Sequence, residues 1–91
     1  SNQVRDAYYL PVPARVVRRL AELLAIYDPS GCAAAVMLPF TQEELAQLVG
    51  TVRPTANKAL QALSDEGLLT IGRGRLTVTD PAGLRSRAQR P

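Results

Sequence analysis

The feature that most constrains this chain is the stretch from Thr41 to Leu60, which predicts two short helices joined by a tight turn at Gly50. Thr41 is followed three residues later by Glu44, and this T-x-x-E spacing is typical of a capping box at a helix start. Gly50 ends the first helix because glycine enters the left-handed conformation of a helix stop without steric cost. Apolar residues at helical spacing form one face of that helix: Leu45, Ala46, Leu48 and Val49.

The second helix of the pair, predicted for about residues 52–64, separates an apolar face from a polar one. Its apolar set has the spacing i, i+3, i+4 and i+7: Ala56, Ala59, Leu60 and Leu63. At about 100° per residue, the other side carries Pro54, Asn57, Lys58 and Gln61, flanked by Arg53 and Thr55. Such a pair is typical of a helix-turn-helix, whose second helix presents hydrogen-bond donors to the major groove of DNA.

Length and composition bound the chain to one small domain with a single modest core. It has 91 residues, of which 46% are hydrophobic, an ordinary share for a globular protein. The formal net charge of +3 favours a polyanionic partner. Cys32 is the one cysteine, which excludes an internal disulfide, suggests a reducing compartment and predicts a small packing residue. No apolar run approaches the roughly 18 residues of a membrane span, so we expect a soluble, cytoplasmic chain without a membrane partner.

The sequence argues against an enzyme. It contains no histidine, which removes the commonest general base and the commonest metal ligand. It also lacks a CxxC pair, a Walker loop and a dinucleotide fingerprint. The G-x-G at residues 72–74 has no third glycine, and no helical pattern follows it. We therefore predict no catalytic residue, no metal ligand and no cofactor-binding residue in this domain.

A first helix is predicted after a proline-rich entry. Pro11 and Pro13 are too close together to lie inside a helix, so residues 3–12 predict an extended entry or linker. Pro13 suits the first turn of the helix that follows. The apolar stripe of that helix consists of Val16, Val17, Leu20, Leu23 and Leu24. Its opposite face carries Arg15, Arg18, Arg19 and Glu22, and most of these arginines are predicted to be solvated.

A wing is predicted directly after the second helix of the pair. Gly67 closes that helix. Residues 69–71 and 76–79 then alternate apolar side chains with threonine, which is the pattern of a half-buried hairpin. The glycines of residues 72–75 supply its turn. The expected fold class is thus mainly α with a small β-hairpin: a winged helix-turn-helix with a three-helix core and a two- to three-stranded antiparallel sheet.

Three further segments complete the chain. Residues 28–31, Asp-Pro-Ser-Gly, are typical of a turn and are predicted to end the first helix. Residues 36–40 predict a brief edge strand with Pro39 at its end, where no ladder donor is needed. Residues 82–88 predict one or two helical turns around Leu84, and the basic tail that begins at Arg85 is expected to be frayed.

The predicted DNA contacts follow from where the donors fall. Backbone amides at the start of the helix at Gln42 suit a phosphate, and Arg53 can pair with guanine O6 and N7 for about 1–3 kcal/mol of discrimination. The predicted base contacts are Arg53, Asn57 and Lys58. The predicted backbone contacts are Thr41, Gln42, Thr55, Gln61, Arg73 and Arg75.

Other roles for these residues stay open at this point. Arg53 has two nearby acids as alternative partners, Glu43 and Asp65. Lys58 can be a plain solvated residue, and Asn57 can pair with adenine or with a phosphate. The rival function is a winged helix used for protein–protein contact, in which the basic face binds an acidic partner.

Residues 14–84 resemble the C-terminal DNA-binding domain of the CRP/FNR superfamily of bacterial transcription regulators. The resemblance runs through residues 15–21, 38–46 and 50–60, and then through Leu63, residues 67–69 and the glycine-basic wing. It implies sequence-specific binding of double-stranded DNA by a homodimer, with one recognition helix per half-site of an inverted-repeat operator. RNA polymerase is a candidate partner of such a regulator.

The resemblance also implies a domain that this sequence lacks. Family members carry an N-terminal sensory domain, which is where a cyclic nucleotide or other effector would bind. Residues 1–12 are accordingly interpreted as a tag remnant and a hinge or linker, and residues 13–91 as the winged helix-turn-helix domain. Without a dimerisation helix the isolated domain is expected to be monomeric or weakly dimeric.

Two positions depart from the pattern of the family. Many members have a glutamate where this chain has Pro54, and that glutamate accepts a hydrogen bond from a cytosine amino group. Pro54 has no acceptor in its side chain and no amide hydrogen, so this contact should be lost. The family's frequent second arginine is Lys58 here, which keeps the charge without the fork geometry of a guanidinium. The operator is therefore expected to differ from the usual one.

Overall fold

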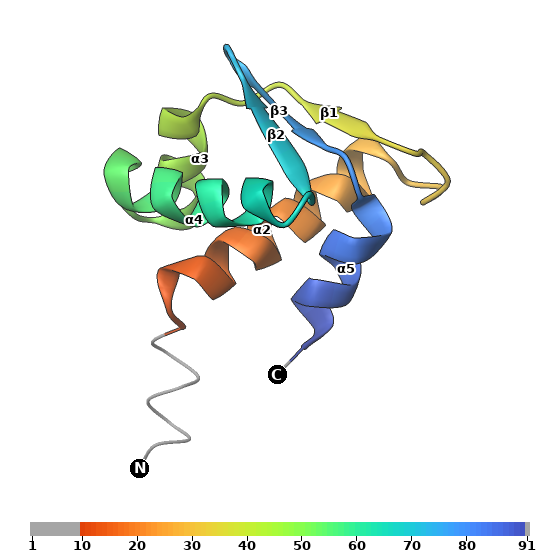
Figure 1. Ribbon diagram of the computed structural model, residues 1–91, viewed down its shortest axis with the longest axis horizontal. Helices are drawn as coiled ribbons and strands as arrows, with labels where there is room; N and C mark the ends of the chain where they lie inside the picture. The colour runs from red at the N-terminus through yellow and green to blue at the C-terminus, as the bar shows by residue number, and fades with distance from the viewer. Residues whose placement is uncertain (1–9, 91) are drawn as a thin grey trace.

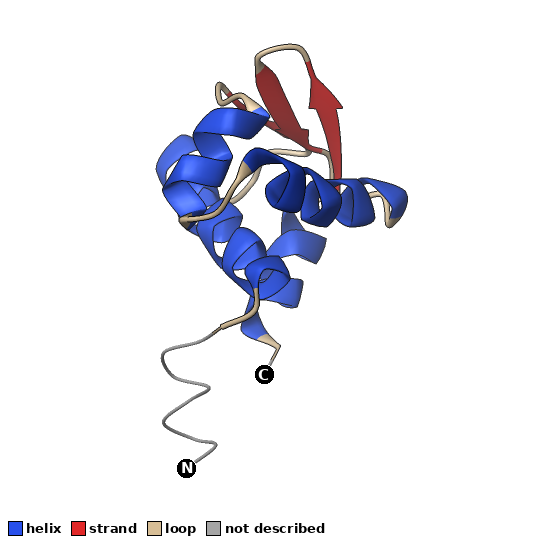
Figure 2. Ribbon diagram, turned by 90° about the vertical axis from the view of Figure 1, so that its left-hand side faces the viewer, coloured by secondary structure: helices blue, strands red, loops and turns tan. Residues whose placement is uncertain are grey.

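In the computed structural model, which describes residues 10–90, four helices pack with a three-stranded antiparallel sheet. Figures 1 and 2 show the sheet at one side of the molecule and most of the helical mass below it. The elements in chain order are α2 (Val12–Tyr27), β1 (Val36–Leu38), α3 (Gln42–Val49), α4 (Arg53–Asp65), β2 (Leu69–Gly72), β3 (Arg75–Val78) and α5 (Pro81–Gln89). This arrangement confirms the winged helix-turn-helix. The predicted tag remnant and most of the predicted linker lie outside the described residues.

Helix α2 begins at Val12, so that Pro13 lies in its first turn, where a missing backbone N–H costs nothing. All five residues of the predicted apolar stripe are buried. The helix ends at Tyr27, and the Asp28 N–H donates to the Leu24 carbonyl over 2.8 Å. The turn predicted at residues 28–31 is therefore confirmed.

The capping box of α3 is present in both directions. The Glu44 N–H donates to Thr41 Oγ1 (3.0 Å), and the Thr41 N–H donates to Glu44 Oε1 (2.9 Å). At the other end Gly50 has φ +83°. The N–H groups of Gly50 and Thr51 both donate to the Ala46 carbonyl (2.9 Å each). Carbonyls in the last turn of a helix otherwise lack partners within the helix. The chain then turns directly into α4.

One member of the predicted apolar face of α3 is not buried. Leu48 is 38% exposed, whereas Leu45, Ala46 and Val49 lie in the core. At about 100° per residue, Leu48 and Ala46 stand about 160° apart around the helix axis. Because α2 and α4 cover a narrower sector of this short helix, they bury Ala46 and leave Leu48 at the edge.

Replacing Gly50 with alanine is expected to lower the free energy of unfolding by about 1 kcal/mol, since a Cβ in the left-handed region costs roughly 1–2 kcal/mol. A Cβ built at Gly50 meets no atom within 4 Å, so the loss reports backbone strain alone. Thermal or urea unfolding of the variant measures it. Gly50→Asn is the matched control, because asparagine tolerates this conformation better. Equal stability of Gly50→Ala and the parent would contradict the helix stop.

The strand order is β1-β3-β2, which makes β1 an edge strand as predicted. Val36 pairs with Val78 across β1 and β3, and Leu69 pairs with the same Val78 across β2 and β3. The hairpin is tighter than the sequence predicts: Gly72 is paired with Arg75, so only residues 73 and 74 form the turn. The inward side chains of the sheet are buried and comprise Val36, Leu38, Leu69, Leu76 and Val78.

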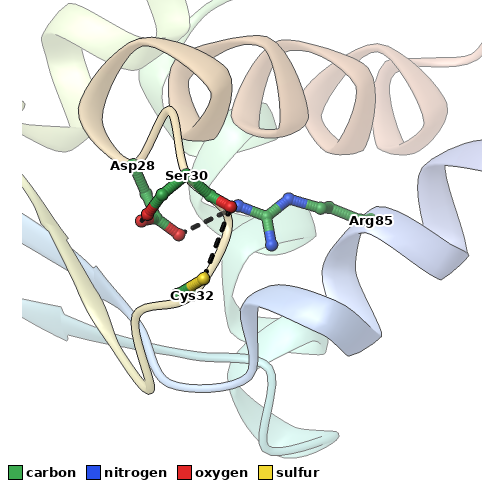
Figure 3. Close-up of polar contacts among 4 residues, drawn as sticks. All are labelled: Asp28, Ser30, Cys32 and Arg85. Atoms are coloured by element: carbon green, nitrogen blue, oxygen red, sulfur yellow. Dashed lines mark hydrogen bonds and ion pairs between the residues drawn. The ribbon is translucent and has the colours of Figure 1, made fainter.

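The prediction for Cys32 is wrong, because this side chain is exposed. Residues 31–35 are all exposed and connect α2 to β1 outside the core. The thiol lies 3.6 Å from the Ser30 carbonyl oxygen and packs in no interior site (Figure 3). Among the described residues, no helix is long and apolar enough to cross a membrane.

The predicted fraying of the basic tail is also wrong. Asp80 caps α5 by accepting from the Gly83 N–H (3.0 Å), and Leu84 is fully buried. Arg85 Nη2 lies 3.1 Å from Oδ2 of Asp28, a carboxylate that is itself buried (Figure 3). Arg87 forms an ion pair with Glu66 at the end of α4. Partners this far away in sequence hold the helix to α2 and α4, so local composition could not reveal its order.

Candidate nucleic-acid interface

The start of α3, the start of α4 and the turn of the hairpin meet in one groove. Its lining consists of Thr41, Gln42, Glu43, Arg53, Gly72, Arg73 and Gly74. Figure 2 shows the hairpin turn standing beyond the helices at the top of the view. The two-residue turn of the hairpin therefore places the Arg73 cation beside the N-terminal end of α3. We call this the wing groove.

The outer face of α4 continues from the wing groove. A shallow depression there is lined by Pro54, Thr55, Asn57, Lys58 and Gln61. The inner face of the same helix is buried against α2 and β2. Packing of this inner face thus decides which side chains of α4 point outward. We call the wing groove and this outer face together the α4 surface.

The structure brings together eight of the nine predicted contact residues. Arg53, Thr55, Lys58, Gln61 and Arg73 are exposed on the α4 surface, and Thr41, Gln42 and Asn57 lie there half-buried. The ninth, Arg75, is exposed but lines neither part. Its side chain lies across Gly72, where a Cβ would come within 3.1 Å of the Arg75 Cγ. Arg75 therefore flanks the wing groove from the neighbouring strand.

Within the part of the chain that the structure describes, the cations of the α4 surface form no ion pair. Among residues 10–90, no ion pair joins Arg53 to Glu43 or to Asp65, so neither alternative partner is realised. Lys58, Arg73 and Arg75 likewise take part in none of the ion pairs between described residues. By contrast Arg19, Arg85 and Arg87 each pair with an acid. Four cations without an ion-pair partner among the described residues thus lie on or beside the α4 surface.

The α3 end of the wing groove presents unused backbone donors. The Glu44 N–H is bonded to Thr41 Oγ1, whereas the preceding amides of the first turn have no partner inside the helix. These amides lie at the positive end of the helix dipole, which suits an anion. The Thr41 hydroxyl accepts one hydrogen bond and keeps its own O–H to donate.

The sequence reasoning missed one residue of this interface, Glu43, and one exposed residue next to it, Val52. Glu43 lines the wing groove and places a carboxylate among its cations. Its position next to Gln42 in the first turn of the helix could have predicted this. Val52 is 63% exposed at the N-cap of α4, directly before Arg53. The sequence could have indicated its exposure, because an apolar residue stands at an N-cap position that usually holds a polar one.

The α4 surface is mainly polar. Its side chains are hydroxyls, amides and cations, together with the carboxylate of Glu43 and the apolar ring of Pro54. Within residues 10–90, no group of three histidine, cysteine, aspartate or glutamate side chains is placed to hold a metal ion.

Comparison with known proteins agrees with this geometry. A family model described as a Crp-like helix-turn-helix domain matches residues 14–87. The CRP-like cAMP-activated global transcriptional regulator of Mycobacterium tuberculosis is 34% identical over 90 residues, covering 98% of this chain and 40% of that protein. The transcriptional regulator SdrP of Thermus thermophilus is 39% identical over 76 residues, covering 84% of this chain and 36% of that protein.

A solved structure gives the same result. The catabolite activator protein of Thermus thermophilus superposes with a TM-score of 0.67 at 32% identity, covering 85% of this chain and 33% of that one. This chain spans about 40% of the length of the M. tuberculosis relative.

Proposed function

The chain belongs to the family of Crp-like helix-turn-helix domains, and from this premise we propose that the α4 surface reads an operator in double-stranded DNA. The domain is the DNA-binding output domain of a transcription regulator. The observation that carries the residue assignment is the collection of unpaired donors on the outer face of α4, opposite a buried inner face.

The shape of α4 supports insertion into the major groove. An α-helix with its side chains is about 10–12 Å across, which fits a major groove about 12 Å wide. Arg53 stands in the first turn of α4, the part that reaches base edges in such modules. Asn57 and Lys58 follow one turn later and complete the proposed base contacts.

Phosphates on either side of the major groove are proposed to bind the remaining residues. Thr41, Gln42 and the first amides of α3 hold one strand, while Arg73 and Arg75 of the wing hold the sugar–phosphate backbone further along. Thr55 and Gln61 border the inserted face and take neutral hydrogen bonds. The Glu43 carboxylate repels phosphates, so a DNA backbone can enter the wing groove only where its phosphates avoid this side chain.

For the whole regulator we propose a homodimer on an inverted repeat. Each α4 would then occupy one half-site, with half-site centres about 34–36 Å apart. The effector, a cyclic nucleotide or another small molecule, is proposed to bind outside residues 13–91, and RNA polymerase remains a candidate partner. The proposed place of action is the cytoplasm, and the proposed role is regulatory and not enzymatic.

Selection of preferred sites from random duplexes, followed by fluorescence anisotropy over a range of salt concentrations, tests this function. We expect enrichment of one sequence, and an affinity that falls with salt with a slope of about −3 for three to four phosphate contacts. The rival function, docking of an acidic protein on the same face, predicts binding to polyglutamate without enrichment of any duplex. That result would overturn the proposal.

Replacing Arg75 with alanine is expected to weaken binding to all duplexes by a similar factor. Because Arg75 lies on β3 beside the wing groove, its loss removes about one phosphate contact and reduces the salt slope by about 1. Anisotropy with the selected duplex and with a scrambled one measures both quantities. Arg90→Ala removes the same charge far from the wing and should leave the slope unchanged. A changed base preference in Arg75→Ala would instead place this residue among the base contacts.

A further inference from the structure

One residue in the middle of the outer face of α4 has an apolar side chain. The spacing i, i+3, i+4 and i+7 places four residues in a stripe along one side of this helix: Pro54, Asn57, Lys58 and Gln61. All four line the shallow depression of the α4 surface. Three of them offer an amide or an ammonium group to a ligand, whereas Pro54 offers only a hydrocarbon ring.

The ring of Pro54 lies on the side of α4 that faces away from the core. The buried stripe of the helix consists of Ala56, Ala59, Leu60 and Leu63. At about 100° per residue, the centre of that stripe lies roughly 190° from Pro54 around the helix axis. Pro54 is exposed, so its ring is available to whatever the outer face of α4 binds.

Pro54 is also at the leading end of the helix. Helix α4 begins at Arg53, which makes Pro54 its second residue. Proline is tolerated at a helix start because the first amides have no partner within the helix, but this does not say what the exposed ring contacts. Neighbouring Cα atoms are about 3.8 Å apart, and bases follow one another about every 3.4 Å along a DNA strand. A base pair next to the guanine assigned to Arg53 is therefore within reach of Pro54.

We propose that Pro54 reads a thymine methyl group in the base pair next to the guanine bound by Arg53. This inference rests on the proposed insertion of α4 into the major groove. The C5 methyl group of thymine is the one apolar substituent that base pairs present there, since the other groups are hydrogen-bond donors or acceptors. Against the methyl group, the ring removes apolar surface from water. Against a donor or acceptor, it displaces water without returning a hydrogen bond.

Base analogues in the selected duplex test this contact with the 91-residue chain. Arg53→Ala first identifies the guanine. Each thymine in the two adjacent base pairs is then replaced with deoxyuridine, which lacks only the methyl group. We expect one replacement to weaken binding by the parent about fourfold, the fold-change that corresponds to one buried methylene-sized group. Deoxyuridine in place of a thymine outside the half-sites is the matched control and should change nothing.

Cytosine and 5-methylcytosine at the sensitive position separate the methyl group from the rest of the base. Cytosine should weaken binding more than deoxyuridine does, because its amino group would face the ring without an acceptor. The methyl group of 5-methylcytosine occupies the same ring position as that of thymine. It should therefore recover about fourfold in affinity relative to cytosine.

Two variants at the start of α4 assign the methyl contact to one residue. Pro54→Glu replaces the ring with a carboxylate, which can accept a hydrogen bond from the cytosine amino group. It should bind the thymine and deoxyuridine duplexes equally and prefer cytosine; these ratios cancel the general repulsion between the carboxylate and phosphates. Val52→Ala is the matched control, because Val52 is 63% exposed on the other side of Arg53 but does not line the depression. It should keep the fourfold ratio.

Failure of this inference differs from failure of the proposed function. An enriched site without a methyl-dependent thymine beside the guanine overturns the inference alone. The same holds if the fourfold ratio survives in Pro54→Glu or is lost in Val52→Ala. Enrichment of no duplex at all overturns the proposed function and the inference together. A methyl dependence that Pro54→Glu removes and Val52→Ala retains supports the role of Pro54.

Discussion

Replacing Arg53 with alanine is expected to abolish the preference for guanine at one position of each half-site. Arg53 is exposed in the first turn of α4 and pairs with no acid among the described residues. Its guanidinium is therefore free to bind guanine O6 and N7, a contact worth about 1–3 kcal/mol of discrimination. Competition between the selected duplex and duplexes with each alternative base at that position measures the loss.

Arg53→Lys is the matched control for charge. Lysine keeps the attraction to phosphates but lacks the bidentate fork, so general affinity should survive while discrimination falls. Binding of a scrambled duplex should change little between Arg53→Lys and the parent. An unchanged base preference in Arg53→Ala would show that α4 is not inserted in the proposed way.

Replacing Leu60 with alanine is expected to destabilise the domain by about 2–5 kcal/mol. Leu60 is fully buried on the inner face of α4 and belongs to the common core with α2 and the sheet. A small domain has a total stability of about 5–15 kcal/mol, so this loss is a large fraction of it. Urea unfolding followed by circular dichroism measures the change.

Leu48→Ala is the corresponding control, because the same substitution removes a leucine that is 38% exposed. Its cost should be smaller, about 1–1.5 kcal/mol, since part of the side chain is already in water. Equal losses in Leu48→Ala and Leu60→Ala would contradict the burial of the inner face of α4. Duplex affinity of Leu60→Ala, measured at a temperature where it stays folded, should be close to that of the parent.

The sequence alone determined the features that depend on near neighbours in the chain. The capping box joins Thr41 to Glu44, only three residues on, and Gly50 is required by the backbone of its own turn. The inner face of α4 follows from a period of 3.6 residues, which the sequence displays directly. Local patterns also predicted which element carries each of the eight contact residues that lie together: the start of α3, the outer side of α4 or the turn of the hairpin. Their meeting on one surface depends on the packing of these elements.

The tertiary structure decided the features that depend on partners far away in the chain. Leu48 is exposed because α2 and α4 cover only one sector of α3. Helix α5 is ordered because Arg85 meets Asp28, 57 residues earlier. Within residues 10–90, Arg15 Nε is buried and has no hydrogen-bond acceptor. Local patterns specify which face of an element is apolar, but only packing specifies how much of that face is covered and which charges meet across the molecule.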